Sequence, residues 1–267
     1  MVIRRIREHV ATHNWFAVGI DLAIVMLGVF LGIQASNWNE SRIEAEEGRS
    51  YRARLIAELD FNTRQHRQQS AYYRQVLGHG VAALASLRSE KIRDPSRFLI
   101  DAVQLTQVDT SPGKSYIYNE MVSSGLVDRL GDEAVQQAAS DYYIQVSEND
   151  RALQHSHPFR DIVRGIVPYS IQAEIQVHCG DRNVYYRKRI IGVKLAGSCP
   201  VRLDPTLAAE SARQIRNEPE IERSVVRYLG SIHEKLGSLD DTLNLATQLR
   251  SLLHRPAKVD RNASAGP

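Results

Sequence analysis

The sequence predicts a mainly α-helical protein: an N-terminal transmembrane helix, then a bundle of long helices with a small inserted β-hairpin. Residues 15–38 form an apolar span that begins at Trp15, ends at Trp38 and carries one formal charge, Asp21. A bilayer core about 30 Å thick needs roughly 20 apolar helical residues, and indole rings favour its boundaries. Beyond the span, apolar residues recur every three or four positions, which indicates amphipathic helices.

Two other interpretations of the apolar span compete with a membrane anchor. The core helix of a soluble protein normally shows a polar face, and residues 22–33 have none. A secretory signal usually has an apolar stretch of about 7–15 residues and a small-residue cleavage site. Ala35-Ser36 is a weak site of this kind, but the span is longer and ends in a tryptophan. We therefore predict an uncleaved, single-pass anchor.

The orientation of the span in the membrane is predicted from the charged residues on either side of it and from the two cysteines. Arginines in the leading tail favour a cytoplasmic N-terminus, although arginines also follow the span, so their number alone does not decide it. Cys179 and Cys199 suit one disulfide in an oxidising compartment; two free buried thiols are the alternative. We expect a bacterial inner-membrane protein with a periplasmic domain. Its parts are a basic cytoplasmic tail at 1–14, the span at 15–38, a helical domain at 39–255 and a flexible tail at 256–267.

Small residues mark one stripe of the span. Gly28 and Gly32 stand four apart, Ser36 continues the row, and Asp21 falls on nearly the same face. Such spacing lets two membrane helices approach closely, and a carboxyl in lipid is expensive unless it is paired or near the boundary. We expect this stripe to pack against a partner helix, most simply a second copy. The alternative is that glycines are merely common in membrane helices.

The first part of the domain is predicted to be helical. Residues 41–89 contain no proline, and we expect one long helix that can continue from the span. Its middle, 62–70, is polar and is expected to face solvent or a partner. A shorter helix follows at 97–105, and Ser111-Pro112-Gly113 is a loop.

An αα-hairpin is predicted next. A short helix over residues 116–121 ends at Ser123-Ser124-Gly125, where Gly125 suits the left-handed cap position. Asp132 then opens a helix that runs through Val146. Leu126 and Leu130 are expected to pack beneath the two helices.

These motifs resemble an uncharacterised family of small single-pass bacterial membrane proteins, a domain of unknown function. The resemblance covers roughly residues 1–145. Its most specific part is the Asn37-Trp38-Asn39-Glu40 exit, preceded by Asn14-Trp15-Phe16, and the later Ser-Ser-Gly hairpin with Tyr142-Tyr143 is similar to the second hallmark. It implies an anchor with a helical extracytoplasmic domain, but no activity and no catalytic residues.

The cysteine region is expected to contain the β-hairpin, at about 170–200. Ile171, Ala173, Ile175 and Val177 alternate with polar residues, as in a half-buried strand. Residues 180–183 are predicted to turn and residues 184–195 to form the second strand. That turn would separate the cysteines, so the chain is expected to fold back again near Gly192 or Gly197 if they are bridged.

The last helix has the clearest pattern. From Ile221 to Leu253, apolar residues advance by steps of three and four as a narrow seam. We expect this helix to pack along the helix at 41–89.

The sequence motifs that would indicate metal binding or catalysis are weak. His155, His157 and His178 lack a recognised zinc spacing, and the Ser123-Ser124 pair lacks the glycine of a nucleophile elbow. No metal or cofactor site is predicted. Basic residues interleaved with tyrosines at 182–194 suit an anionic lipid or polymer, or simply a solvated strand face.

The predicted function is a non-catalytic interaction or scaffold module that binds the bilayer and either itself or another membrane protein. A sensor acting through a partner is a variant, and an enzyme built on Glu120, Asp128 and Asp132 is the competing class. The formal charge of +3 includes a tail with three arginines and one glutamate. The near-neutral remainder gives no drive toward nucleic acid.

Overall fold

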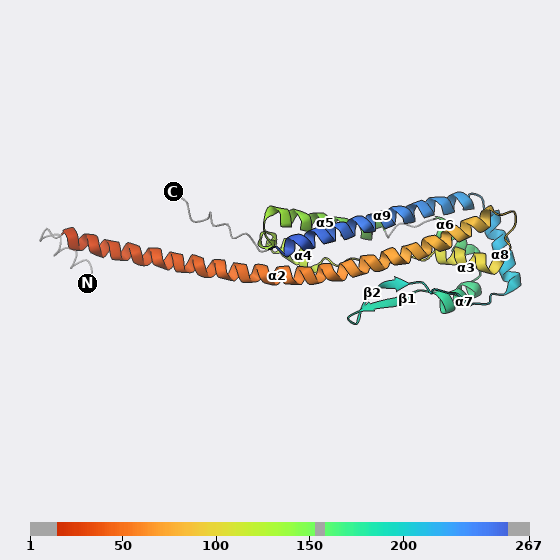
Figure 1. Cartoon of the computed structure of the whole chain (residues 1–267), viewed down its shortest axis with the longest axis horizontal. Helices are drawn as coiled ribbons and strands as arrows, with labels where there is room; N and C mark the ends of the chain where they lie inside the picture. The colour runs from red at the N-terminus through yellow and green to blue at the C-terminus, as the bar shows by residue number, and fades with distance from the viewer. Residues whose placement is uncertain (1–14, 153–157, 256–267) are drawn as a thin grey trace. The chain divides into compact units, whose positions relative to one another are not determined.

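The computed structural model describes residues 15–152 and 158–255, and it confirms the mainly α-helical fold with one small hairpin (Figure 1). Predictions for residues 1–14 and 256–267, and for His155 and His157, lie outside the described residues. The elements in chain order are α2 (Trp15–Arg88), α3 (Pro95–Leu105), α4 (Tyr116–Ser123), the 3₁₀ helix η1 (Val127–Leu130), α5 (Glu133–Ala152), α6 (Pro158–Ile166), α7 (Tyr169–Cys179), β1 (Arg182–Tyr186), β2 (Arg189–Lys194), α8 (Pro205–Asn217) and α9 (Ile221–Leu253).

The chain divides into two units, 1–51 and 52–267. In the first unit, residues 15–51 are the beginning of α2, and the large apolar side chains of the predicted span are exposed along it. The predicted helix at 41–89 is confirmed as part of the same element. In the second unit, residues 52–88 of α2 form the helix against which the rest of that unit packs.

The predicted packing of the last helix along α2 is confirmed. Arg88, at the end of α2, binds Glu222 in the first turn of α9 at 2.7 Å, while Arg250 near the end of α9 pairs with Asp60. The two helices are therefore antiparallel. Helix α5 packs against both: Asn149 donates to Thr242 of α9 at 2.6 Å, and the Tyr143 hydroxyl donates to Glu58 of α2 at 2.7 Å.

Local capping follows the predicted chemistry. Gly125 has φ +67°, a conformation that costs glycine little, and Asp132 accepts a hydrogen bond from the backbone N–H of Val135 at the start of α5. In the connection between α4 and α5, Leu130 is fully buried and Leu126 is half-buried.

Two groups of buried apolar side chains lie along the α2 segment of the second unit. The larger joins the end of α2 to α3, α6, α7, α8 and the start of α9, and includes Tyr72, Phe98 and Phe159. Nearer Arg52, Leu55 and Leu59 are buried outside that cluster, as are residues of α4, η1, α5 and late α9. Between the two, the buried residues of α2 are polar.

The predicted strand at 171–177 is wrong, because this segment is helix α7. Ile171, Ile175 and Cys179 are spaced four apart and are buried, whereas Val177 is exposed. Ile171 and Ile175 fit both a period of two and a period near four, so the apolar pattern did not exclude a helix. Packing against α3 and α6 selects the helix, since it buries the four-spaced set together.

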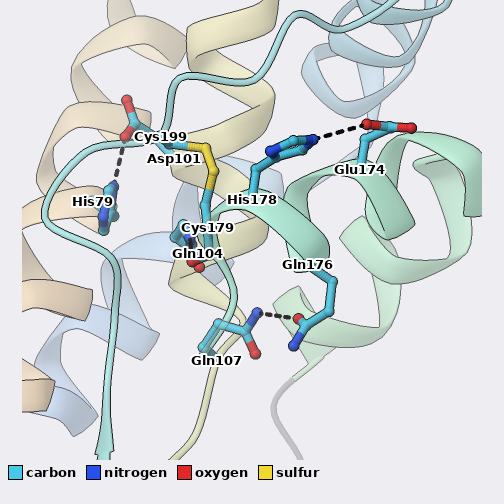
Figure 2. Close-up of a disulfide and its surroundings, with 9 residues drawn as sticks. All are labelled: His79, Asp101, Gln104, Gln107, Glu174, Gln176, His178, Cys179 and Cys199. Carbon is cyan, nitrogen blue, oxygen red and sulfur yellow. Dashed lines mark hydrogen bonds and ion pairs between the residues drawn. A yellow bond between two sulfur atoms is a disulfide. The ribbon is translucent and has the colours of Figure 1, made fainter. Parts of the chain in front are cut away.

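The predicted turn at 180–183 is also wrong, because β1 begins at Arg182 and the turn lies at Arg187-Lys188. The strands pair antiparallel with Arg182 opposite Lys194, and a bulge leaves Ile191 of β2 without a partner, between the Val184–Gly192 and Tyr185–Ile190 pairs. This later turn places Cys179 and Cys199 at the open end of the hairpin. They form the predicted disulfide, with Cα atoms 5.1 Å apart (Figure 2). No additional fold-back is needed.

The disulfide is expected to stabilise the folded unit. It closes a separation of 20 residues, for which chain entropy predicts a loss of about 3 kcal/mol when the bridge is removed. Urea unfolding of the full-length chain in detergent, followed by circular dichroism, should show this loss for the double variant Cys179→Ala/Cys199→Ala. Reducing agent should destabilise the wild type similarly and leave the double variant unchanged. Equal stability with and without reductant in the wild type would contradict the prediction.

Candidate functional site

The predicted membrane stripe lies on an open surface of α2 within the first unit. Trp15 and Trp38 are 67% and 69% exposed, and a Cβ added at Gly28 or Gly32 would meet nothing within 4 Å. Among the described residues, α2 is the one helix long and apolar enough to cross a membrane, judged by length and composition, and none of its apolar window is buried. Packing of the stripe against a partner stays a prediction.

The prediction that residues 62–70 face solvent or a partner is wrong, because one side of this polar stretch is buried within the second unit. Asn62, Gln65, His66, Gln69 and Ser70 are at most 3% exposed. Neutral amide side chains can be buried when each finds a hydrogen-bond partner. In this unit the partner is the backbone of the irregular segment 109–115, which connects α3 to α4.

The amide side chains bind that segment's backbone directly. Asn62 donates to the carbonyl of Lys114 at 2.7 Å and accepts from its N–H at 2.9 Å, and Gln65 donates to the carbonyls of Ser111 and Pro112. Gln69 donates to the Ser111 carbonyl at 2.8 Å. The backbone groups of this segment have no strand partner, and side chains on the surface of α2 form their hydrogen bonds instead. We call this set of contacts the polar seam.

The seam extends at both ends. Toward Arg52, Glu58 accepts from the Ile117 N–H and from the Tyr143 hydroxyl, the latter at 2.7 Å. Burial and the Glu58 carboxylate both raise the pKa of Tyr143, so its hydroxyl remains a donor. Toward the hairpin, Gln68 donates to the Val193 carbonyl of β2 at 2.8 Å.

The base of the hairpin carries a second carboxyl contact, made by the half-buried Asp181. Tyr72 of α2 donates to both oxygens of Asp181 at 3.2 and 3.3 Å. Burial raises the pKa of Asp181, while the Tyr72 hydrogen bond opposes that rise. The contact fixes the chain between the end of α7 and the start of β1.

His66 is a buried titratable group within the seam. Burial lowers its pKa from 6.5 to about 4, and Lys235 adds to the effect. Its Nδ1 lies 3.3 Å from Gln69 Oε1. Because the Gln69 amide nitrogen is used on Ser111, Oε1 accepts and Nδ1 carries the proton. Nε2 is buried and has no protein hydrogen-bond partner among the described residues.

Lys235 and Asp150 lie on the α9 and α5 side of the seam. Burial lowers the pKa of Lys235 to about 8, with Asp150 acting in the opposite direction, and the Lys235 ammonium donates to the Asn149 carbonyl at 3.0 Å. Burial raises the pKa of Asp150, whose Oδ1 accepts from the Gly113 N–H at 3.2 Å. These groups also bind backbone rather than converge on an open position.

The carboxylates considered for an enzyme are not brought together as a shared site by the contacts of the described residues. Glu120 pairs with Arg54 of α2 at the surface, Asp132 caps α5, and Asp128 lies exposed on η1. The Ser123-Ser124-Gly125 sequence ends α4, where the Ser123 hydroxyl donates to the Glu120 carbonyl.

No group of three or more metal-ligating side chains occurs within residues 15–152 and 158–255. His178 pairs with Glu174 on the exposed side of α7, at 3.5 Å (Figure 2). The neighbouring Cys179 sulfur is committed to the disulfide, and its carbonyl accepts from Gln104 at 2.7 Å.

The basic tyrosine-rich segment forms the exposed surface of the hairpin. Tyr185 and Ile190 are cross-strand partners, 63% and 50% exposed. At the turn, Arg187 and Lys188 have φ of 47° and 63°, the left-handed values that two-residue hairpins usually assign to Asn-Gly. Each such residue costs about 1–2 kcal/mol of conformational strain. Two cations therefore occupy a turn that other residues would make more easily.

Comparison with known proteins does not assign the chain: no family model, no curated protein and no solved structure matches it.

Sequence reasoning missed the seam because polar residues on a helix normally face water. A signal was present. Arg64 and Arg67 fall on the exposed side, whereas the neutral amides and His66 share the buried side. Separating charged from neutral polar residues would have identified the buried face.

The seam makes stability depend on pH through His66. Its pKa is about 4 in the folded chain and about 6.5 when unfolded, so the unfolded state takes up a proton first as pH falls. Stability is expected to be complete above pH 6.5 and to fall by about 3 kcal/mol as the pH drops toward 4. Urea unfolding at a series of pH values measures this loss.

The variant His66→Asn isolates that contribution, since its amide can replace Nδ1 but does not titrate. It should flatten the stability curve between pH 6.5 and 4 relative to wild type. His233→Asn, on the exposed side of α9, is the matched control and should keep the wild-type slope. If both variants keep that slope, the assignment of the pH dependence to His66 fails.

Proposed function

We propose that the chain is a non-catalytic interaction module anchored by one pass in a bacterial inner membrane, with a cytoplasmic N-terminus and a periplasmic folded domain. The observation that carries the proposal is the exposure of every large apolar side chain from residue 20 to residue 33 of α2. Such a surface needs lipid or another apolar partner to cover it. The disulfide agrees with an oxidising compartment.

The polar seam supports an interaction role rather than catalysis. Its amides, Glu58, Asp150 and Lys235 are engaged with backbone groups or with Tyr143. They hold the connection between α3 and α4 in place. The exposed hairpin and the stripe on α2 then remain as the surfaces available to partners.

Membrane attachment is tested by carbonate extraction of cells that express the full-length chain. Wild type should remain with the membranes, because lipid covers the span. The double variant Val25→Asp/Phe30→Asp places two charges mid-span and should lose membrane retention. A phosphatase that needs an oxidising compartment, fused after Arg255, should be active only if the domain is exported. Wild-type protein in the carbonate supernatant, or an inactive fusion, would contradict the proposal.

Self-association through the stripe gives a further prediction. Gly32→Ile should weaken pairing in a membrane two-hybrid assay by about tenfold, because the larger side chain separates the helix backbones. Gly19→Ile is the matched control: Gly19 lies about half a turn away from Gly28 around the helix, and it is equally open. Equal signals from Gly32→Ile and wild type would show that the stripe is not the interface.

A further inference from the structure

We infer that the β1 edge of the hairpin binds an extended acidic segment of another polypeptide by strand addition. This inference rests on the proposed interaction role and specifies the chemistry of the partner. It draws on three features of the hairpin: its unequal edges, its charge and its strained turn.

The two edges of the hairpin differ. The β2 edge is occupied: the Val193 carbonyl accepts from Gln68, its N–H lies 3.5 Å from Asp109 Oδ2, and the Leu195 N–H binds Gln75 at 3.2 Å. Figure 1 shows β2 between β1 and α2. For the outer edge of β1, the part of the chain that the structure describes supplies no hydrogen bond.

The register identifies which β1 groups are available. In an antiparallel pair, the two residues of a non-hydrogen-bonded position direct their N–H and C=O groups away from each other. The Val193 groups are bonded outside the sheet, so its partner Asn183 occupies such a position. The Asn183 N–H and C=O therefore point outward from β1. An added strand satisfies a donor and an acceptor of this kind together.

The charge of the hairpin selects an acidic partner. Residues 182–194 contain five lysines and arginines and no aspartate or glutamate, whereas the whole chain has a formal charge of only +3. Arg64 of α2 adds a cation 4.2 Å above the ring of Tyr186. A second copy is disfavoured on this edge, because it would bring the cations of two basic hairpins together with no acidic residue in either.

The turn gives an independent indication. Arg187 and Lys188 adopt left-handed backbone conformations that Asn-Gly would adopt without strain. Strain that persists where a simpler residue would relieve it points to function.

A peptide also fits this surface better than an anionic lipid does. A phosphate oxygen accepts hydrogen bonds from cations and from N–H groups, but it cannot donate to the outward Asn183 carbonyl.

The test measures fluorescence anisotropy of a labelled peptide of alternating glutamate and valine, with the full-length chain in neutral-lipid nanodiscs. Replacing the turn by Asn-Gly (Arg187→Asn/Lys188→Gly) removes two cations while relieving strain, so binding should weaken about tenfold without loss of stability. The control Lys91→Gln/Arg93→Gln removes two exposed cations from the loop before α3 and should bind as wild type does.

Strand addition is separated from simple charge attraction in two ways. Asn183→Pro removes the outward N–H, a change that edge strands tolerate, and should weaken binding about tenfold at unchanged charge. The same peptide with alternate N-methylated residues should bind more weakly to wild type. Equal binding by the turn variant, or equal binding of the methylated peptide, overturns the inference. So does hairpin-dependent capture of anionic vesicles with no peptide binding. None of these outcomes affects the carbonate and phosphatase tests of the proposed function.

Discussion

The folded unit depends on hydrogen bonds between the amide side chains of α2 and the backbone of segment 109–115. That segment has no regular structure and is half-buried against α2, so the peptide groups that face α2 would otherwise lack partners. Asn62 replaces a neighbouring strand by both donating to and accepting from Lys114. Because the segment joins α3 to α4, these contacts also connect the two apolar groups that flank the seam.

The long helices and two of the caps could be predicted from the sequence because each depends on local spacing. Gly125 and Asp132 are caps whose chemistry is confined to a few residues. Along α9, apolar residues recur every three or four positions, and this spacing matches no other regular structure. The pairing of Cys179 with Cys199 follows from there being two cysteines in the chain.

The errors arose where two structures satisfied the same local pattern. Ile171 and Ile175 fit a strand and a helix equally, and only contacts with distant helices decide between them. Residues 62–70 looked solvated because their partner is a backbone segment more than 40 residues away. The sequence indicates which side of the helix is buried, because the neutral amides recur every three or four positions there, but it does not identify the distant segment that binds them. The exposed basic hairpin was found in outline, but its free edge depends on a register that the sequence does not specify.

The contacts that anchor the hairpin involve its base and β2, not its turn. Its base is tied by the disulfide and by Tyr72 on Asp181, and β2 is bonded to Gln68 and Gln75 of α2. With base and one edge fixed, the register does not depend on a favourable turn sequence. A strained Arg187-Lys188 turn is then tolerated at a modest cost in stability. The same anchoring presents β1 as a pre-ordered edge, so a binding partner would not need to order the hairpin first.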